Sequence, residues 1–236
     1  MKKIIVFVTA LFFSVNSIYS QNYTSKDVNI FTELNTRVKT DNSFIDYDDV
    51  QGSPYLNDKF LEGKVYRNDS ILSNTVSLRY NIFDDQIEVK DPSIEKNDGY
   101  GTLLKTYEIS AEILFEQYKY YRNFRNPSSN AVGSYLQVIK EGKSYTLLKK
   151  HEVVFNPKEP YKSPYDTGKD AEFKKNQYYY VLDSENNFTE LPDRKSRLSK
   201  IFNEKGKKLK SFVSRNNINL KEEEGILRVF SYLDNI

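Results

Sequence analysis

Most of the chain alternates apolar and polar residues over short runs that turn-forming residues separate. This period of two is typical of β-strands with one buried face. In 135–150, YLQVIKEGKSYTLLKK, a two-residue loop at Glu141-Gly142 predicts a hairpin, because glycine can supply the positive φ that tight turns need. The residues expected on one side of this hairpin are Leu136 opposite Leu147 and Val138 opposite Tyr145. A second hairpin is expected across 178–191, where YYYVLD and FTEL flank SENN.

The segment 78–91, LRYNIFDDQIEVKD, raises the question of a metal or catalytic site, because acidic residues crowd between apolar ones. These acidic residues are Asp84, Asp85, Glu88 and Asp91. The apolar positions change from even to odd numbers across Asp84-Asp85, and a turn there keeps both apolar sets on one face. The acids are then divided between a turn and an outer face, and the glycine of an EF-hand calcium loop is missing. The pattern therefore favours a sheet over a metal site.

A two-residue loop at Asp84-Asp85 fixes the pairs across this hairpin. The expected pairs are Ile82 with Ile87 and Tyr80 with Val89 on the buried face, and Arg79 with Lys90 and Asn81 with Glu88 on a solvated face. Two aspartates are not the preferred residues of such a turn, so a longer loop or a bulge stays open.

Three further runs are rich in aromatic and branched residues, which favours strands. They are KFLEGKVYRND at 59–69, LLKTYEI at 103–109 and ILFEQYKYYRNF at 113–124. The last run also matches a helical spacing through Leu114, Tyr118 and Tyr121, but its composition favours a strand.

After Pro192 the apolar period changes from two to 3.6, which predicts about three short amphipathic helices. Their apolar stripes are Leu198, Ile201 and Phe202, then Leu209, Phe212 and Val213, then Ile226, Val229, Phe230 and Leu233. Asn219 is a suitable N-cap for the last helix, with Glu222 placed as in a capping box. Strands followed by helices predict an α+β fold, an antiparallel β-sheet or partial barrel built from hairpins with a helical tail packed on it.

The first 20 residues have the pattern of a secretory signal peptide. Lys2 and Lys3 precede an apolar run, which is shorter than the roughly 20 residues that span a bilayer. We expect cleavage near Ser20/Gln21, export to the periplasm or the outer membrane, and no transmembrane segment in the mature chain. The expected organisation is a signal peptide at 1–20, a β-rich domain at 21–192 with a polar lead-in at 21–58, and a C-terminal helical segment at 193–236.

Charge and cysteine content narrow the classes of partner. The chain contains no cysteine, so no disulfide can form. It has 35 basic and 33 acidic residues, and removal of Lys2 and Lys3 leaves the mature chain formally neutral, without a general attraction to nucleic acid. The strongest local charge is a basic run in the tail, made of Arg194, Lys195, Arg197, Lys200, Lys205, Lys207, Lys208 and Lys210. Such a run is usually a solvated helix face, and as a binding surface of an exported protein it suits lipid headgroups or acidic glycans.

Individual motifs give little support for catalysis. The Asp-Thr-Gly triplet at Asp166 matches the core of aspartic-protease sites, but the chain has no second copy and no apolar strand precedes it. His151 is the only histidine, and its strand phase places it at the sheet margin, bonded to backbone or water. Ser53 lacks the G-x-S-x-G frame of a nucleophile elbow. DGYGT at 98–102 lacks the spacing of phosphate-binding loops and predicts a loop before a strand.

Several segments resemble, in their order and spacing, a family of exported proteins of the Bacteroidota that has no established function. They are GSPYLNDKFLEGKV at 52–65, LRYNIFDDQIEV at 78–89, EGKSYTLLKK at 141–150 and the ending from Arg194. The resemblance covers most of the mature chain. It implies a place in a two-membrane envelope, periplasmic or outer-membrane associated, and it implies neither an activity nor functional residues.

We therefore predict a non-enzymatic binding or structural component of the cell envelope, with no catalytic, metal-binding or cofactor-binding residues and no cofactor. Envelope proteins, lipid headgroups and glycans are the partner classes that stay open. One alternative is a carboxylate-dependent hydrolase that uses Asp166 or the loop around 46–49. It requires two carboxylates, or His151 and a carboxylate, in one pocket with perturbed pKa values. The other alternative, a carrier of an apolar ligand, requires an apolar cavity in a curved sheet.

Overall fold

The structure is a computed structural model that describes residues 50–90, 100–127, 131–160 and 168–236. Within these residues, ten antiparallel strands form one open sheet, and three helices follow at the C-terminal end. The predicted α+β class with a C-terminal helical tail is confirmed. The expected signal peptide and most of the expected polar lead-in lie outside the described residues.

The sheet has the spatial order β10-β9-β8-β7-β6-β5-β1-β2-β3-β4. Its strands are β1 (Leu61–Arg67), β2 (Ser70–Asn81), β3 (Gln86–Lys90), β4 (Tyr100–Thr102), β5 (Ile109–Ile113), β6 (Glu116–Arg125), β7 (Val132–Glu141), β8 (Tyr145–Asn156), β9 (Glu172–Asp183) and β10 (Phe188–Glu190). The helices are α1 (Lys195–Ile201), α2 (Asn203–Arg215) and α3 (Glu223–Leu233). Neighbouring strands are consecutive in the chain everywhere except at the β1–β5 contact, as expected for a sheet built mainly from hairpins.

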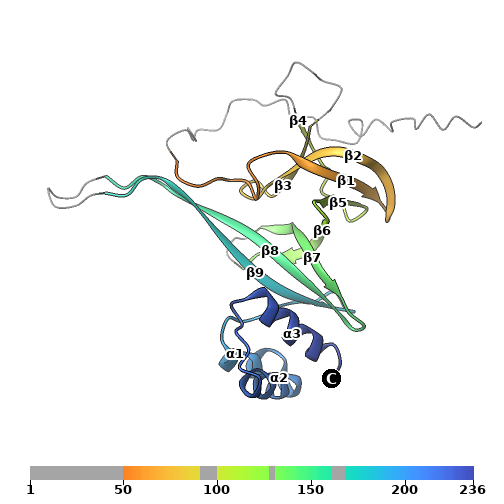
Figure 1. The fold of residues 1–236 in the computed structure, drawn as a ribbon, viewed down its shortest axis with the longest axis vertical. Helices are drawn as coiled ribbons and strands as arrows, with labels where there is room; N and C mark the ends of the chain where they lie inside the picture. Colours follow the sequence, from red (N-terminus) through yellow and green to blue (C-terminus); the bar gives the residue numbers. More distant parts are fainter. Residues whose placement is uncertain (1–49, 91–99, 128–130, 161–167) are drawn as a thin grey trace, which may run out of the picture.

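The helices cover one face of the sheet near β7, β8 and β9, whereas β1 to β4 lie at the opposite end of the molecule (Figure 1). The β8–β9 hairpin is the longest strand pair, with partners from Tyr145 and Asp183 to Asn156 and Glu172. It reaches beyond the other strands (Figure 1).

Three groups of buried side chains form the core. The first group lies mainly among β1 to β7, with Val153 of β8 and Phe173 of β9, and includes Leu78, Ile87, Ala111 and Tyr118. The second joins the sheet to the helices and includes Leu147, Val181, Leu209 and Val229. The third consists of Phe124, Leu136, Leu148 and Tyr180. Adjacent residues Leu147 and Leu148 belong to different groups, so β8 is buried on both faces.

The hairpin predicted at 78–91 is confirmed as β2 and β3, but the predicted register is wrong. The observed pairs are Leu78 with Val89, Tyr80 with Ile87, and Asn81 with Gln86. Each partner is shifted by two residues, and such a shift leaves every side chain on its predicted face. The loop covers residues 82–85, with Asp85 at a positive φ of 52°. Two aspartates do not form the tightest turn, and the longer loop sets the new register.

The predicted solvated face of this hairpin is also wrong. Arg79 lies opposite Glu88 instead of Lys90, and Glu88 is only 1% exposed. Arg79 donates from Nε and Nη2 to Glu88 Oε2 at 2.9 and 2.6 Å. The guanidinium carbon of Arg79 lies 3.7 Å from the ring centre of Tyr55 and 4.4 Å from that of Phe60. The segment before β1 therefore covers this face.

The hairpin predicted at 135–150 is confirmed as β7 and β8, but its predicted pairs are wrong. The observed pairs are Val138 with Leu148, Lys140 with Leu147, and Glu141 with Thr146. The loop is 142–144, and the register shifts between Val138 and Lys140. Leu136 and Leu147, predicted on one side, therefore lie in the third and second core groups. Alternation could not reveal this shift, because both faces of β8 are buried.

The aromatic run at 113–124 is confirmed as mostly strand. A turn at Leu114 and Phe115, with φ values of 47° and 71°, separates β5 from β6. The hairpin expected at 178–191 is confirmed as β9 and β10, with Phe188 opposite Leu182.

Two other predictions need correction. The strand predicted at 103–109 is wrong, because residues 103–108 form a loop and β5 begins at Ile109. The loop predicted at 98–102 lies partly outside the described residues, and its described part, Tyr100–Thr102, is strand β4.

The three helices predicted after Pro192 are confirmed. The stripe of α3 is buried as predicted, through Ile226, Val229, Phe230 and Leu233. Ile201 is 36% exposed, contrary to the prediction, because α1 ends at this residue. Asn219 does not cap α3, because the N-cap is Glu222, to which Asn219 Nδ2 donates at 2.7 Å. None of the helices in the described part of the chain is long and apolar enough to cross a membrane.

Candidate functional site

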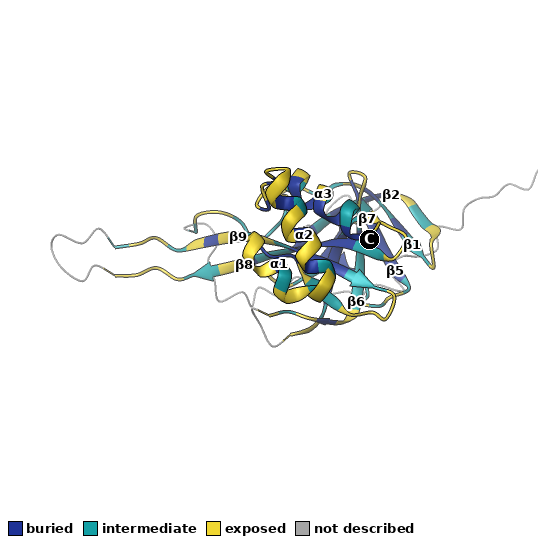
Figure 2. Cartoon of the chain, turned by 90° about the horizontal axis from the view of Figure 1, so that it is seen from below, coloured by how far each residue is buried: buried dark blue, intermediate teal, exposed yellow. Residues whose placement is uncertain are grey.

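The basic face is the surface formed by the charged residues of α1 and α2. From Arg194 to Arg215 the chain has nine basic residues and one acidic residue, a net charge of +8, whereas the whole chain carries +2. The basic residues are Arg194, Lys195, Arg197, Lys200, Lys205, Lys207, Lys208, Lys210 and Arg215. All except Lys205 are exposed. Figure 2, seen from below, shows this exposed surface on α1 and α2, in front of the sheet.

Helix packing explains why these charges point outward. Leu198, Leu209 and Val213 are at most 3% exposed, and the charged residues between them, apart from Lys205, are exposed to solvent. The ion pairs of this face within the described residues are Arg194 and Arg197 with Asp193, and Lys207 with Glu204. Lys205 donates to the Tyr145 hydroxyl at 3.2 Å, which ties α2 to β8. Most of the positive charge is therefore available to a partner.

A shallow hollow of about 810 Å³ lies between the side chains of the basic face. Three cations and three hydroxyl groups line it: Lys207, Lys210, Arg215, Ser199, Ser211 and Ser214. Cationic and hydroxyl donors form strong hydrogen bonds with anionic oxygens, such as those of phosphate. The hollow therefore has the donor set of an anion-binding surface.

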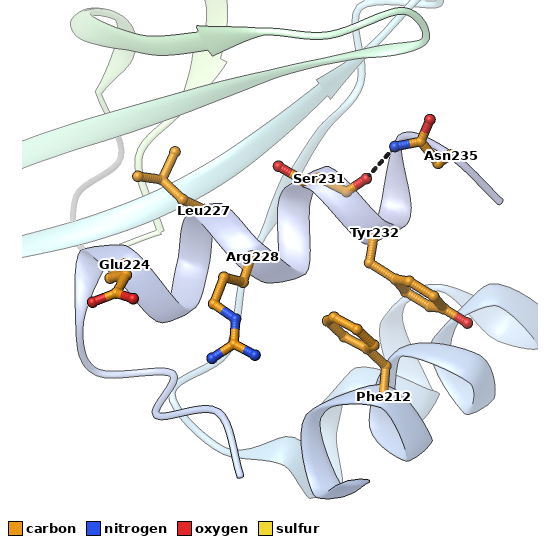
Figure 3. A pocket seen from close by; sticks show the side chains of 7 residues that line it. All are labelled: Phe212, Glu224, Leu227, Arg228, Ser231, Tyr232 and Asn235. Carbon is orange, nitrogen blue, oxygen red and sulfur yellow. Dashed lines mark hydrogen bonds between the residues drawn. The ribbon is translucent and has the colours of Figure 1, made fainter. Parts of the chain in front are cut away.

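A second groove, of about 450 Å³, lies between α2 and α3 (Figure 3). Phe212 of α2 and Tyr232 of α3 stack with ring centres 4.2 Å apart and an angle of 2° between the planes. Arg228 extends from α3 into the space between the two helices, and Glu224 lies one turn earlier on α3 (Figure 3). The stacked rings hold the two helices together beside the basic face.

A cleft of about 560 Å³ lies between β9, β10 and the helices, and two carboxylates line it. Burial raises the pKa of Glu190 above its ordinary value, Arg197 opposes this effect, and Asp193 adds to it. Asp193 Oδ1 lies 3.7 Å from Arg197 Nη1. No motif marks either acid, although the two are only three residues apart in the sequence.

The turn of the β2–β3 hairpin enters the body of the molecule, which the sequence analysis missed. Lys150 Nζ lies 2.9 Å from Asp85 Oδ1 and 2.5 Å from Ser134 Oγ. The Tyr80 hydroxyl donates to the same Asp85 oxygen at 2.6 Å. Lys150 and Ser134 are 4% and 3% exposed. A serine and a lysine can form a catalytic pair, but here the buried lysine is neutralised by Asp85, and the group joins three strands and a turn.

His151 lies within β8, and the predicted bond to backbone or water is wrong. Its Nε2 lies 2.7 Å from the side-chain oxygen of Gln137. Burial, together with the positive charges of Lys149 and Lys150, lowers the pKa of His151 to about 4. The imidazole is therefore neutral at ordinary pH and held in the sheet.

The remaining candidates form no site in the described residues. Asp166, Asp91 and the loop at 46–49 lie outside them. Ser53 Oγ accepts a hydrogen bond from the amide of Tyr55 at 3.2 Å, as in a local turn. Among the described residues, no three acidic or histidine side chains are close enough together to hold a metal ion. No family model, curated protein or solved structure matches the chain.

Proposed function

We propose that the protein is an exported, non-enzymatic component of the cell envelope that binds anionic lipid headgroups through the basic face. The observation that carries this proposal is the concentration of nine basic residues against one acidic residue between Arg194 and Arg215, the segment that forms α1 and α2. The rest of the chain is net acidic, so the attraction is directed to one side of the molecule.

The number of charges is sufficient for a useful affinity. Each lysine or arginine held at an anionic membrane surface contributes about 1 kcal/mol, and the interaction decays within a Debye length. Several lysines acting together therefore give a salt-sensitive, reversible attachment.

The arrangement of the charges favours a lipid surface over a single small anion. They are distributed along α1 and α2, whose exposed surface faces away from the sheet (Figure 2). A planar surface engages many such charges at once, whereas a small anion occupies only the hollow at Lys207 and Lys210. The signal-peptide pattern supports export, which makes envelope lipids the available anionic surface.

Vesicle sedimentation tests this proposal. The exported chain is mixed with phosphatidylcholine vesicles with or without phosphatidylglycerol. We expect binding only to the anionic vesicles, and release by added salt. A variant with Lys195, Lys200, Lys208 and Lys210 changed to Gln should lose most of this binding. The matched control changes four exposed lysines outside the tail, Lys59, Lys90, Lys158 and Lys174, to Gln.

The control has the same net charge as the tail variant, so it separates a local surface from overall charge. Equal loss in both variants, or no binding of the unaltered chain to anionic vesicles, would overturn the proposal. Export is tested separately by N-terminal sequencing of the protein recovered from the envelope, which should begin near Gln21. Recovery of the uncleaved chain only from the cytosol would contradict the proposed export to the cell envelope.

A carboxylate-dependent hydrolase is the second candidate, and the cleft with Glu190 and Asp193 favours it. Burial raises the pKa of Glu190, as it does for the proton donors of carboxylate-dependent hydrolases, and Asp193 lies beside it as the second carboxylate of the cleft. The test is a screen of ester and glycoside substrates. Activity that disappears in both Glu190→Gln and Asp193→Asn would establish this candidate, and a screen without turnover would remove it.

A further inference from the structure

A pocket of about 580 Å³ lies between β6, the β9–β10 turn and the loop before β5. Its walls include Tyr107, Tyr121, Arg122, Asn123, Asn186 and Phe188. This volume is within the range of small-molecule sites, roughly 300 to 1,000 Å³. The pocket shares no residue with the basic face, the α2–α3 groove or the cleft at Glu190.

An irregularity of β6 directs consecutive side chains into this pocket. The flanking pairs are Tyr121 with Ser134 and Arg125 with Val132. Three residues of β6, 122–124, therefore lie opposite the single residue Gly133. Residues 120–123 all line the pocket, although successive side chains of a regular strand point to opposite faces. Bulges that re-aim side chains in this way are common beside functional sites.

Gly133 makes this arrangement possible. Its φ is +81°, a conformation that favours glycine. A Cβ at this position would collide with the hydroxyl group of Tyr120, which lies against the glycine. The Tyr120 ring also contacts Tyr135, with 5.4 Å between ring centres. The positive φ and the close approach of Tyr120 therefore both favour glycine at this position of the pocket wall.

A frame of aromatic rings holds the opposite wall in place. Phe188 of β10 packs against Tyr121 and Phe124 of β6, with ring centres 5.6 and 5.3 Å apart. Phe124, 0% exposed, packs edge-on against Tyr180 at 5.0 Å. These edge-to-face contacts are favourable. They connect β10 to β6 across three intervening strands, so the pocket is formed before any ligand binds.

The walls have the chemistry that recognises a sugar ring. Their polar groups are tyrosine hydroxyls, two amides and one guanidinium, and they include no carboxylate. The CH face of a sugar packs on aromatic rings, while its hydroxyls need groups that both donate and accept hydrogen bonds, as Asn123 and Asn186 do. A guanidinium binds a carboxylate in a bidentate manner, which favours an acidic sugar at Arg122. Tyr107 lines the pocket and is 77% exposed, so its ring is accessible to a ligand.

We propose that this pocket binds an acidic saccharide. Tyr107 and Tyr121 contact the sugar ring, Asn123 and Asn186 bind its hydroxyls, and Arg122 binds its carboxylate. This site is separate from the basic face and does not depend on lipid binding.

Calorimetric titration with an oligogalacturonate, a malto-oligosaccharide and inorganic phosphate tests the site. We expect the oligogalacturonate to bind more tightly than the malto-oligosaccharide, and phosphate alone not to bind measurably at this pocket. Tyr107→Ala should weaken saccharide binding roughly tenfold, because it removes a ring face without disturbing the buried frame. Arg122→Gln should bring the affinity for oligogalacturonate down to that for the malto-oligosaccharide. Tyr232→Ala, in the α2–α3 groove, is the matched control and should bind both as before.

Several results would overturn the site: no saccharide binding by the unaltered chain, unchanged binding in both pocket variants, or phosphate binding that is as tight as oligogalacturonate binding and is lost in Arg122→Gln. Arg122→Gln should leave vesicle binding unchanged. The variant with four tail lysines changed to Gln should leave saccharide binding unchanged. Failure of this proposal is therefore distinguishable from failure of lipid binding.

Discussion

Lysines in two regions of the molecule have opposite roles. Lys149 and Lys150 of β8 are buried and are paired with Glu223 and Asp85. The lysines of the basic face are almost all exposed, and within the described residues only Lys207 forms an ion pair. The same side chain therefore stabilises the fold where its charge is neutralised, and is available for binding where it is not.

The buried pairs connect distant parts of the chain. Asp85 belongs to the β2–β3 turn and Glu223 to the first turn of α3, so the two adjacent lysines join β8 to both ends of the molecule. At the other end of α3, the Asp234 carboxylate accepts hydrogen bonds from the amides of Lys143, Ser144 and Tyr145 at 2.7 to 3.1 Å. The helical tail is thus fixed to the sheet while its outer face stays free.

The largest expected effect is on the buried pair. Lys150→Met should lower the free energy of unfolding by about 3 kcal/mol, because it leaves Asp85 charged and without its ion-pair partner. The double variant with Asp85→Asn should recover part of this loss. Urea unfolding followed by circular dichroism measures both. A loss below about 0.5 kcal/mol is typical of surface substitutions, and it would show that the Lys150–Asp85 ion pair does not stabilise the fold.

His151, beside the paired lysines, should make stability depend on pH. Its pKa is about 4 in the folded protein against 6.5 in the unfolded chain. Above pH 6.5 both states are neutral and the stability is complete. As the pH falls from 6.5 towards 4, the unfolded chain takes up a proton that the folded protein excludes, and up to roughly 3 kcal/mol is lost. Unfolding measured across this range should show the slope, and His151→Asn should reduce it.

Glu223 provides an intermediate case between the two groups. Burial opposes its ionisation, but hydrogen bonds from Lys149 and Tyr179 keep the pKa of Glu223 below its ordinary value. Its side chain is 42% exposed, so Glu223→Gln should cost only about 1 kcal/mol. Thermal unfolding measures the loss. A cost as large as that of Lys150→Met would show that the Lys149–Glu223 ion pair stabilises the fold as strongly as the Lys150–Asp85 ion pair.

The smallest effect on stability is expected at the basic face. Changing Lys195, Lys200, Lys208 and Lys210 to Gln should alter the free energy of unfolding by less than about 0.5 kcal/mol per site, while vesicle binding falls. Urea unfolding of the variant used for sedimentation provides the comparison. Marked destabilisation would show that these lysines support the fold, as the buried lysines Lys149 and Lys150 do.

The sequence by itself determined the α+β class, the main hairpins and the helical tail. Strands and helices bury one face at periods of 2 and 3.6, and both periods are visible without any long-range information. Residues such as Tyr80, Ile87 and Val229 were therefore placed on the correct face. The basic run in the tail was also visible in the sequence, since it depends only on local composition.

Only the tertiary structure decided the registers and the sites. A shift of two residues preserves the face of every side chain, so alternation could not distinguish Tyr80–Ile87 from Tyr80–Val89 pairing. The Asp85–Lys150 pair joins residues 65 positions apart, and the pocket at Tyr121 depends on the approach of β10 to β6. Such contacts are set by strand order, bulges and the path of the chain between elements, which local periodicity does not record.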